Sequence, residues 1–135
     1  MSPNAIGLDF GSGSSPTLCV MFLERGYHID LFDKFYANDT SIFNNYYNFI
    51  TLTEVAEHFD KPGFELDRLF AMLDGGGVLS IMTNMLNSDT NFEYWHYKDD
   101  PTHICFFSQM TMNYLANKWD ARIKFYGDDV VLFFK

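Results

Sequence analysis

The stretch AIGLDFGSGSSP, residues 5–16, decides the fold of this 135-residue chain. Its apolar first half, residues 5–10, predicts a short buried strand, and Pro16 fits the first turn of a helix. In the turn between them, Gly11 and Gly13 lack a Cβ and let a ligand approach the main chain. A strand, a glycine turn and a helix in this order are typical of cofactor sites in open α/β sheets.

The length and composition indicate one globular domain with a core of bulky rings. Hydrophobic residues make up 47% of the chain and aromatic residues 19%, with 15 phenylalanines. The formal net charge is −9, which disfavours binding to nucleic acid or to a membrane surface. We therefore expect neither nucleic acid nor a membrane among the partners.

The two cysteines, Cys19 and Cys105, lie in apolar patterns, which predicts two buried free thiols. They do not form a CxxC pair, so zinc is not indicated. No apolar run reaches the roughly 18 residues of a membrane span, and the N-terminus lacks the features of a signal peptide. The sequence thus predicts a soluble, cytoplasmic protein.

Alternating apolar runs and helical patterns follow the first strand. The apolar runs predict strands at residues 28–33, 47–53, 78–83, 122–126 and 130–134. The helical patterns predict a helix that ends at Gly26, one from Pro62 to Gly75–Gly77, and one capped by Ser108. The last two strands form a hairpin, and residues 34–46 have room for one helical turn only.

Asp33 ends the second predicted strand, 22 positions after Gly11. An acidic residue at this place in nucleoside-cofactor folds accepts hydrogen bonds from the ribose hydroxyls. A carboxylate suits a vicinal diol because it has two acceptor oxygens. A solvated loop aspartate is the alternative interpretation.

A long mixed segment, residues 84–101, contains four closely spaced aromatic residues. A loop of this length in a small domain is usually a lid or a binding loop. Its aromatic residues either form an acceptor pocket or pack the lid shut, and the sequence favours neither. They are Phe92, Tyr94, Trp95 and Tyr97.

Several motifs, in this order, resemble the class I S-adenosylmethionine-dependent methyltransferases. They are LDFGSGS (8–14), Asp33 at a strand end, TEVAEH (53–58) and LDGGGVL (73–79). The block from WHY (95–97) through DPTH (100–103) to FFS (106–108) is similar to one bacterial branch of the family. The likeness covers nearly the whole chain from Ala5.

The resemblance implies a three-layer Rossmann-like α/β sandwich, whose mostly parallel sheet ends in an antiparallel β-hairpin. It also implies S-adenosylmethionine as the cofactor and methyl transfer to a nucleophile, which we expect to belong to a small molecule. The cofactor-binding residues that it implies are Asp9, Gly11, Ser12, Gly13, Asp33, Lys34, Phe35, Thr53 and Glu54.

The chain departs from the family pattern in three ways. Ser14 or Ser15 stands where the third glycine of the motif is usual, and the third family strand is shortened or absent. Only four residues precede Ala5, where the family has one or more helices. We therefore expect residues 1–135 to form a single, N-terminally truncated domain, and a homodimer to cover the exposed face of its sheet.

Methyl transfer needs a general base only where the acceptor must first lose a proton. The candidates for this catalytic role are Glu57, His58 and His103. Each also has a bland interpretation, as a capping residue, a surface residue or a structural histidine, and His58 is as well suited to positioning the acceptor. No metal site is predicted.

Two other functions stay open. One is a cofactor-binding domain or fragment without turnover, which the short N-terminus favours. The other is an NAD-dependent dehydrogenase, which is disfavoured because Pro16 occupies the position of the third small residue in its fingerprint.

Overall fold

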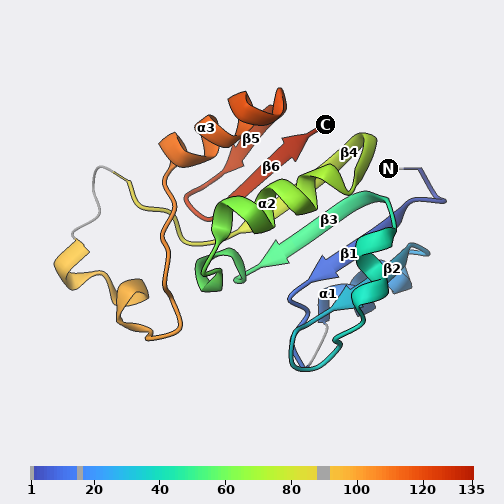
Figure 1. Ribbon diagram of the computed structural model, residues 1–135, viewed down its shortest axis with the longest axis horizontal. Helices are drawn as coiled ribbons and strands as arrows, with labels where there is room; N and C mark the ends of the chain where they lie inside the picture. Colours follow the sequence, from blue (N-terminus) through green and yellow to red (C-terminus); the bar gives the residue numbers. More distant parts are fainter. Residues whose placement is uncertain (1, 15–16, 88–91) are drawn as a thin grey trace.

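A six-stranded sheet forms the middle layer, in the spatial order β2-β1-β3-β4-β6-β5 (Figure 1). The computed structural model describes residues 2–14, 17–87 and 92–135, so the predicted roles of Ser15 and Pro16 lie outside the described residues. The strands are β1 (Ile6–Phe10), β2 (His28–Phe32), β3 (Tyr47–Thr53), β4 (Leu73–Met82), β5 (Arg122–Tyr126) and β6 (Val130–Phe134).

The sheet is parallel except at the C-terminal hairpin. Strands β1 to β4 pair in parallel, whereas β6 runs antiparallel to both β4 and β5. The prediction of a mostly parallel α/β sheet that ends in an antiparallel hairpin is therefore confirmed.

The connection between β2 and β3 contains no strand of its own. Within residues 33–46, all of which are described, Asp33 and Ala37 form a single β-bridge, and one short 3-10 helix follows, η1 (Thr40–Asn44). The side chain of Asp39 caps η1 by accepting a hydrogen bond from the Ser41 N–H at 3.0 Å. This agrees with the expectation of one helical turn and of a shortened or absent third family strand.

Helices cover the two faces of the sheet unequally. Helices α2 (Pro62–Ala71) and α3 (Gln109–Trp119) lie on one face, where they enclose the larger core (Figure 1). Helix α1 (Thr17–Glu24) lies on the other face, over a small cluster of buried residues. That cluster consists of Ala5, Cys19, Ile29 and Phe49.

The start of β4 differs from the prediction. The expectation that Gly75–Gly77 ends the preceding helix was wrong, because α2 ends at Ala71 and the glycines belong to β4. The main chain of this stretch pairs with the end of the chain: the Gly76 N–H donates to the Lys135 carbonyl at 3.0 Å, and the Lys135 N–H donates to Gly77 at 2.9 Å. The glycines therefore continue the sheet where the pattern of residue types indicated a turn.

None of the helices in the described parts of the chain has the length and apolar character needed to cross a membrane.

Candidate active site

A cleft of about 730 Å³ opens at the carboxyl ends of β1, β2 and β3. Ligands of open α/β sheets bind at this edge, because the loops that follow the parallel strands meet there. The lining residues are Phe10, Gly11, Phe32, Asp33, Lys34, Phe35, Phe43, Glu54, Val55, His58, Phe59, Asp60, Glu65, Arg68 and Thr102.

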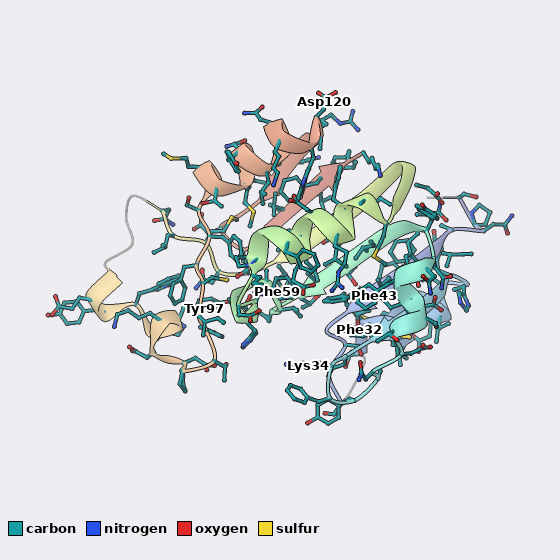
Figure 2. All side chains as sticks on the ribbon, in the orientation of Figure 1. Phe32, Lys34, Phe43, Phe59, Tyr97 and Asp120 are labelled. Carbon is teal, nitrogen blue, oxygen red and sulfur yellow. The ribbon has the colours of Figure 1, made fainter. Side chains whose placement is uncertain are left out.

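One wall of the cleft is aromatic. The rings of Phe10 and Phe32 stack with their centroids 4.8 Å apart, and Phe43 and Phe59 pack edge-on against Phe10. Figure 2 labels Phe32, Phe43 and Phe59. The guanidinium of Arg68 lies 3.9 Å from the centre of the Phe43 ring. Sequence reasoning assigned no role in the site to these residues; the available signal was a phenylalanine at the end of each of two neighbouring strands.

The glycine turn after β1 lies close to the loop that follows β3. Gly11 has a φ of +83°, and a Cβ added there would lie 2.3 Å from Cγ2 of Val55, so only glycine fits. The hydroxyl of Ser12 is buried and makes no hydrogen bond with the described residues. The turn therefore packs so closely on Val55 that a side chain at Gly11 would not fit. It also contains a buried hydroxyl, that of Ser12, which has no partner among the described residues.

The carboxylate of Asp33 joins this turn to the loop after β2. Its Oδ2 accepts the Gly13 N–H at 2.8 Å, and its Oδ1 accepts the N–H groups of Phe35 and Tyr36 at 2.8 and 3.1 Å. A carboxylate has about four acceptor positions, so Asp33 can still accept a hydrogen bond from a hydroxyl of a ligand in the cleft.

The predicted cofactor residues fall into two groups. Gly11, Asp33, Lys34, Phe35 and Glu54 line the cleft, whereas Asp9, Ser12, Gly13 and Thr53 are not among its lining residues.

The carboxyl of Asp9 is buried and accepts a hydrogen bond from the Thr51 hydroxyl at 3.0 Å. Burial raises the pKa of this carboxyl, with the Asp33 charge adding to the effect. The predicted role of Asp9 in cofactor binding would therefore be exerted from behind the cleft-lining residues.

The three predicted catalytic residues lie together on the far side of the cleft. Glu57 and His58 belong to a 3-10 turn, η2 (Ala56–His58), which follows β3. His103 reaches them from a distant segment, which is held in place because the N–H groups of Ile104 and Cys105 both donate to the Glu57 carbonyl, at 2.9 and 3.1 Å.

The exposure of these three side chains differs sharply. Glu57 is completely buried at 0%, His103 is 11% exposed and His58 is 39% exposed. Only His58 lines the cleft. One ligand atom from each of the three residues lies within 4.8 Å of the other two.

A second carboxyl, that of Glu54, completes this polar region. The Tyr97 hydroxyl donates to Glu54 Oε2 at 2.5 Å and lies 3.2 Å from the Thr83 hydroxyl. Burial raises the pKa of Glu54, and the neighbouring Glu57 adds to the shift. Glu54 also has a positive φ of 55°, which is rare for a residue with a side chain.

Two of the four aromatic residues of the long segment, Trp95 and Tyr97, pack against each other. Trp95 stacks on Tyr97 at 5.2 Å and contacts Phe106 at 5.4 Å, while Tyr94 is exposed. The side chain of Phe92 is outside the described part of the chain. Tyr97 contributes its hydroxyl to the polar region (Figure 2), a role that its position in an aromatic cluster did not indicate.

Comparison with known proteins gives the class of this fold and site. A family model described as a methyltransferase domain matches residues 2–123. The chain therefore belongs to the methyltransferase-domain family, and the resemblance to class I S-adenosylmethionine-dependent methyltransferases is confirmed. No curated protein matches the sequence.

Three solved structures illustrate the likeness. A SAM-dependent methyltransferase from Archaeoglobus fulgidus is 14% identical with a TM-score of 0.71, over 98% of this chain and 86% of its own. A 1,6-didemethyltoxoflavin-N1-methyltransferase from Burkholderia thailandensis, with 1,6-didemethyltoxoflavin and S-adenosylhomocysteine bound, is 14% identical with a TM-score of 0.67, over 97% and 70%. Human N-acetylserotonin methyltransferase in complex with SAM is 14% identical with a TM-score of 0.72, over 99% and 48%. At this identity the likeness establishes the fold alone.

Proposed function

We propose that the protein transfers a methyl group from S-adenosylmethionine to a small-molecule acceptor in the cleft at the ends of β1, β2 and β3. The observation that carries the proposal is the placement of Asp33 at the edge of the glycine turn, beside an aromatic wall. The two free cysteines, Cys19 and Cys105, agree with a cytoplasmic location, where thiols stay reduced.

The residues of the cleft fit a nucleoside cofactor. Asp33 retains acceptor capacity for a ribose hydroxyl, and the exposed ring of Phe35 can flank a base. When bound, S-adenosylmethionine supplies a methyl group on a positively charged sulfur. The protein has only to hold the acceptor in line with that methyl group.

The acceptor side of the cleft is the region of Glu57, His58 and His103. Because His58 lines the cleft, it is placed to contact the acceptor, whereas Glu57 and His103 act from behind it. Two of the similar structures are named for methylation of small molecules, 1,6-didemethyltoxoflavin and N-acetylserotonin. These names favour a small acceptor here too.

The direct test is calorimetric titration of the purified chain with S-adenosylmethionine and S-adenosylhomocysteine, with NAD as the control. We expect saturable binding of the first two and none of NAD. If the folded chain binds neither sulfur compound, the proposal is wrong. If it binds them but methylates no acceptor in a broad screen, the alternative of a binding domain without turnover holds.

We also propose that a second copy of the chain packs on the face of the sheet that α1 leaves open. Strand alternation places Met82, Val130 and Leu132 on that face, opposite the larger core, and each is only half-buried. The basic side chains of β5, Arg122 and Lys124, border these three residues. Because the chain as a whole has a net charge of −9, a second copy has acidic surface that is complementary to this basic border.

A further inference from the structure

Glu57 is a carboxyl in the interior of the protein, next to the side chains of Glu54 and Tyr97. Its side chain is 0% exposed, and neither of its oxygens makes a hydrogen bond with the described residues. Burial of an ionised carboxylate without compensation costs several kcal/mol or more, so such a group is normally protonated, paired or bound to a metal.

The two histidines beside Glu57 are held in one orientation by backbone carbonyls. The Nδ1 of His58 lies 2.9 Å from the Thr102 oxygen, and the Nδ1 of His103 lies 2.6 Å from the Tyr97 oxygen. A carbonyl oxygen can only accept, so Nδ1 carries the hydrogen in both rings. In the neutral imidazole, the lone pair is then on Nε2.

The Nε2 atom of each histidine lies near a carboxylate oxygen. Nε2 of His58 is 3.8 Å from Glu57 Oε1, and Nε2 of His103 is 3.5 Å from Asp100 Oδ2. Histidines that bind metals typically donate their other ring N–H to a carbonyl in this way, which fixes the tautomer and aims the lone pair. The arrangement thus has the orienting bonds of a metal site as well as three possible ligands.

We propose that Glu57, His58 and His103 bind one divalent transition-metal ion of the zinc type on the acceptor side of the cleft. Two imidazoles and one carboxylate are a ligand set that suits Zn²⁺ and leaves a coordination position open, whereas Mg²⁺ and Ca²⁺ prefer sites made entirely of oxygen. This differs from the sequence-based expectation, in which no metal site was predicted, because the sequence did not show that His103 reaches the Glu57–His58 pair.

The proposal deepens the proposed function and rests on it. His58 is the ligand that lines the cleft, so the open position is reached from the side where the acceptor binds. When the ion is bound, an acceptor hydroxyl at the open coordination position would have a lower pKa and would release its proton to water. The acceptor oxygen then forms a bond to the methyl carbon, the bond between that carbon and sulfur breaks, and its electron pair stays on sulfur. The inferred class of acceptor is an oxygen nucleophile.

The test is a calorimetric titration of the full chain, stripped with a chelator, with Zn²⁺ and in parallel with Mg²⁺. We expect one Zn²⁺ per chain, no measurable binding of Mg²⁺, and visible absorption bands when Co²⁺ is used instead. Replacement of a ligand should weaken binding by more than the roughly 10- to 100-fold that loss of an outer partner causes. The variants are Glu57→Gln, His58→Ala and His103→Ala.

Matched controls separate this site from adventitious binding. His28→Ala removes an exposed histidine beside Asp30, and Cys105→Ser removes the nearby thiol; neither should change the Zn²⁺ affinity. The absence of saturable Zn²⁺ binding by the folded chain overturns the proposal, and so does binding that His58→Ala leaves intact. His58 is partly exposed, so its variant stays informative if Glu57→Gln does not fold.

Titration with S-adenosylhomocysteine in the presence of chelator keeps the two proposals apart. If that ligand binds and Zn²⁺ does not, the metal site is wrong and the proposed function stands. If Zn²⁺ binds and S-adenosylhomocysteine does not, the metal site stands without the methyltransferase function.

Discussion

Asp33 combines a structural role with its predicted role in cofactor binding. Its two oxygens already hold the N–H groups of Gly13, Phe35 and Tyr36, so the carboxylate fixes both loops that border the cleft. A ligand hydroxyl that donates a hydrogen bond to this carboxylate therefore binds to an oxygen and to loops that are already oriented. This reduces the ordering that binding requires.

We expect Asp33→Ala to weaken the binding of S-adenosylhomocysteine by about 1.5–3 kcal/mol, the usual range for hydrogen bonds to a charged group. Calorimetric titration of the folded variant measures the loss. Asp74→Ala, at an exposed position at the start of β4, is the matched control and should bind normally. An unchanged affinity in Asp33→Ala would remove this residue from the cofactor site.

Gly11 and Gly13 make a matched pair for substitution by alanine, since both have positive φ values, +83° and +70°. A Cβ at Gly13 meets nothing within 4 Å, whereas a Cβ at Gly11 meets Val55. Both variants should lose about 1–2 kcal/mol of unfolding free energy from the backbone, and Gly11→Ala about 1–3 kcal/mol more from the clash.

Denaturant unfolding of both variants checks this difference. The loss of unfolding free energy caused by Gly11→Ala should be smaller in a Val55→Ala background, because the methyl groups that clash with the new Cβ are absent. Equal losses at the two glycines would show that Val55 does not confine the turn.

At the scale of elements, the two helices on the larger core are joined at one aspartate. The carboxylate of Asp67 in α2 accepts two hydrogen bonds from α3. The Lys118 ammonium donates one at 2.7 Å, and the Trp119 indole N–H donates the other at 2.8 Å. The Trp119 ring also stacks on Phe70 at 4.5 Å. These bonds from Lys118 and then Trp119 hold the pKa of Asp67 below its usual value.

This connection predicts how stability depends on pH. Because the pKa of Asp67 is lower in the folded state, its contribution is complete above the usual aspartate pKa of about 4 and is lost as the pH falls below it. Asp67→Asn should lower the unfolding free energy by about 0.2–1 kcal/mol at neutral pH, as for an exposed pair.

The measurement is thermal unfolding of wild type and variant from neutral pH to about pH 3. The gap between the two melting temperatures should narrow below about pH 4, while Asp74→Asn shows no such trend. A gap that stays constant over this range would contradict the assignment.

The sequence predicted the later strands better than the start of β4. Period and turn chemistry gave the bounds of β3, β5 and β6 as the structure has them. The error at Gly75–Gly77 arose because the pairing of Leu73 with Tyr47 and of the glycines with Lys135 is long-range, whereas local propensity favours a turn for three glycines.

The site was predictable only where the ligand groups follow strand ends. Asp33 and Glu54 come directly after strands, so their position at the cleft follows from the sheet alone. The approach of His103 to Glu57 depends on how residues 92–108 fold back, which no local pattern contains. The aromatic wall was missed for a related reason, since Phe10 and Phe32 have the same pattern as core residues.

At the scale of the whole molecule, the two faces of the sheet differ in cover. The larger core gathers residues from all the strands except β2 and β5, with partly buried residues of both packed against it, whereas the smaller cluster includes no buried residue from β4, β5 or β6. On that less covered face, Arg122 of β5 lies 4.8 Å from the centre of the Phe134 ring. This cation shields part of the apolar surface, and the proposed second copy would cover the part over β4 and β6.

We expect sedimentation velocity to show a dimer at high protein concentration. Met82→Asp should abolish it, because a charge on the open face between Val130 and Thr53 cannot be buried without a partner. Met110→Asp, on the outer side of α3, is the control and should remain dimeric, since Met110 is exposed away from this face. A wild-type chain that stays monomeric throughout would show that the dimer proposal is wrong.

The order of the strands has a further consequence, for aggregation. Among the described residues, the sheet ends on both sides in a strand of only five residues, β2 and β5 (Figure 1). Both edges carry charged or ionisable side chains, His28 and Asp30 on β2 and Arg122 and Lys124 on β5. Short, charged edges resist the addition of a strand from another chain, so this sheet is protected against growth into fibrils.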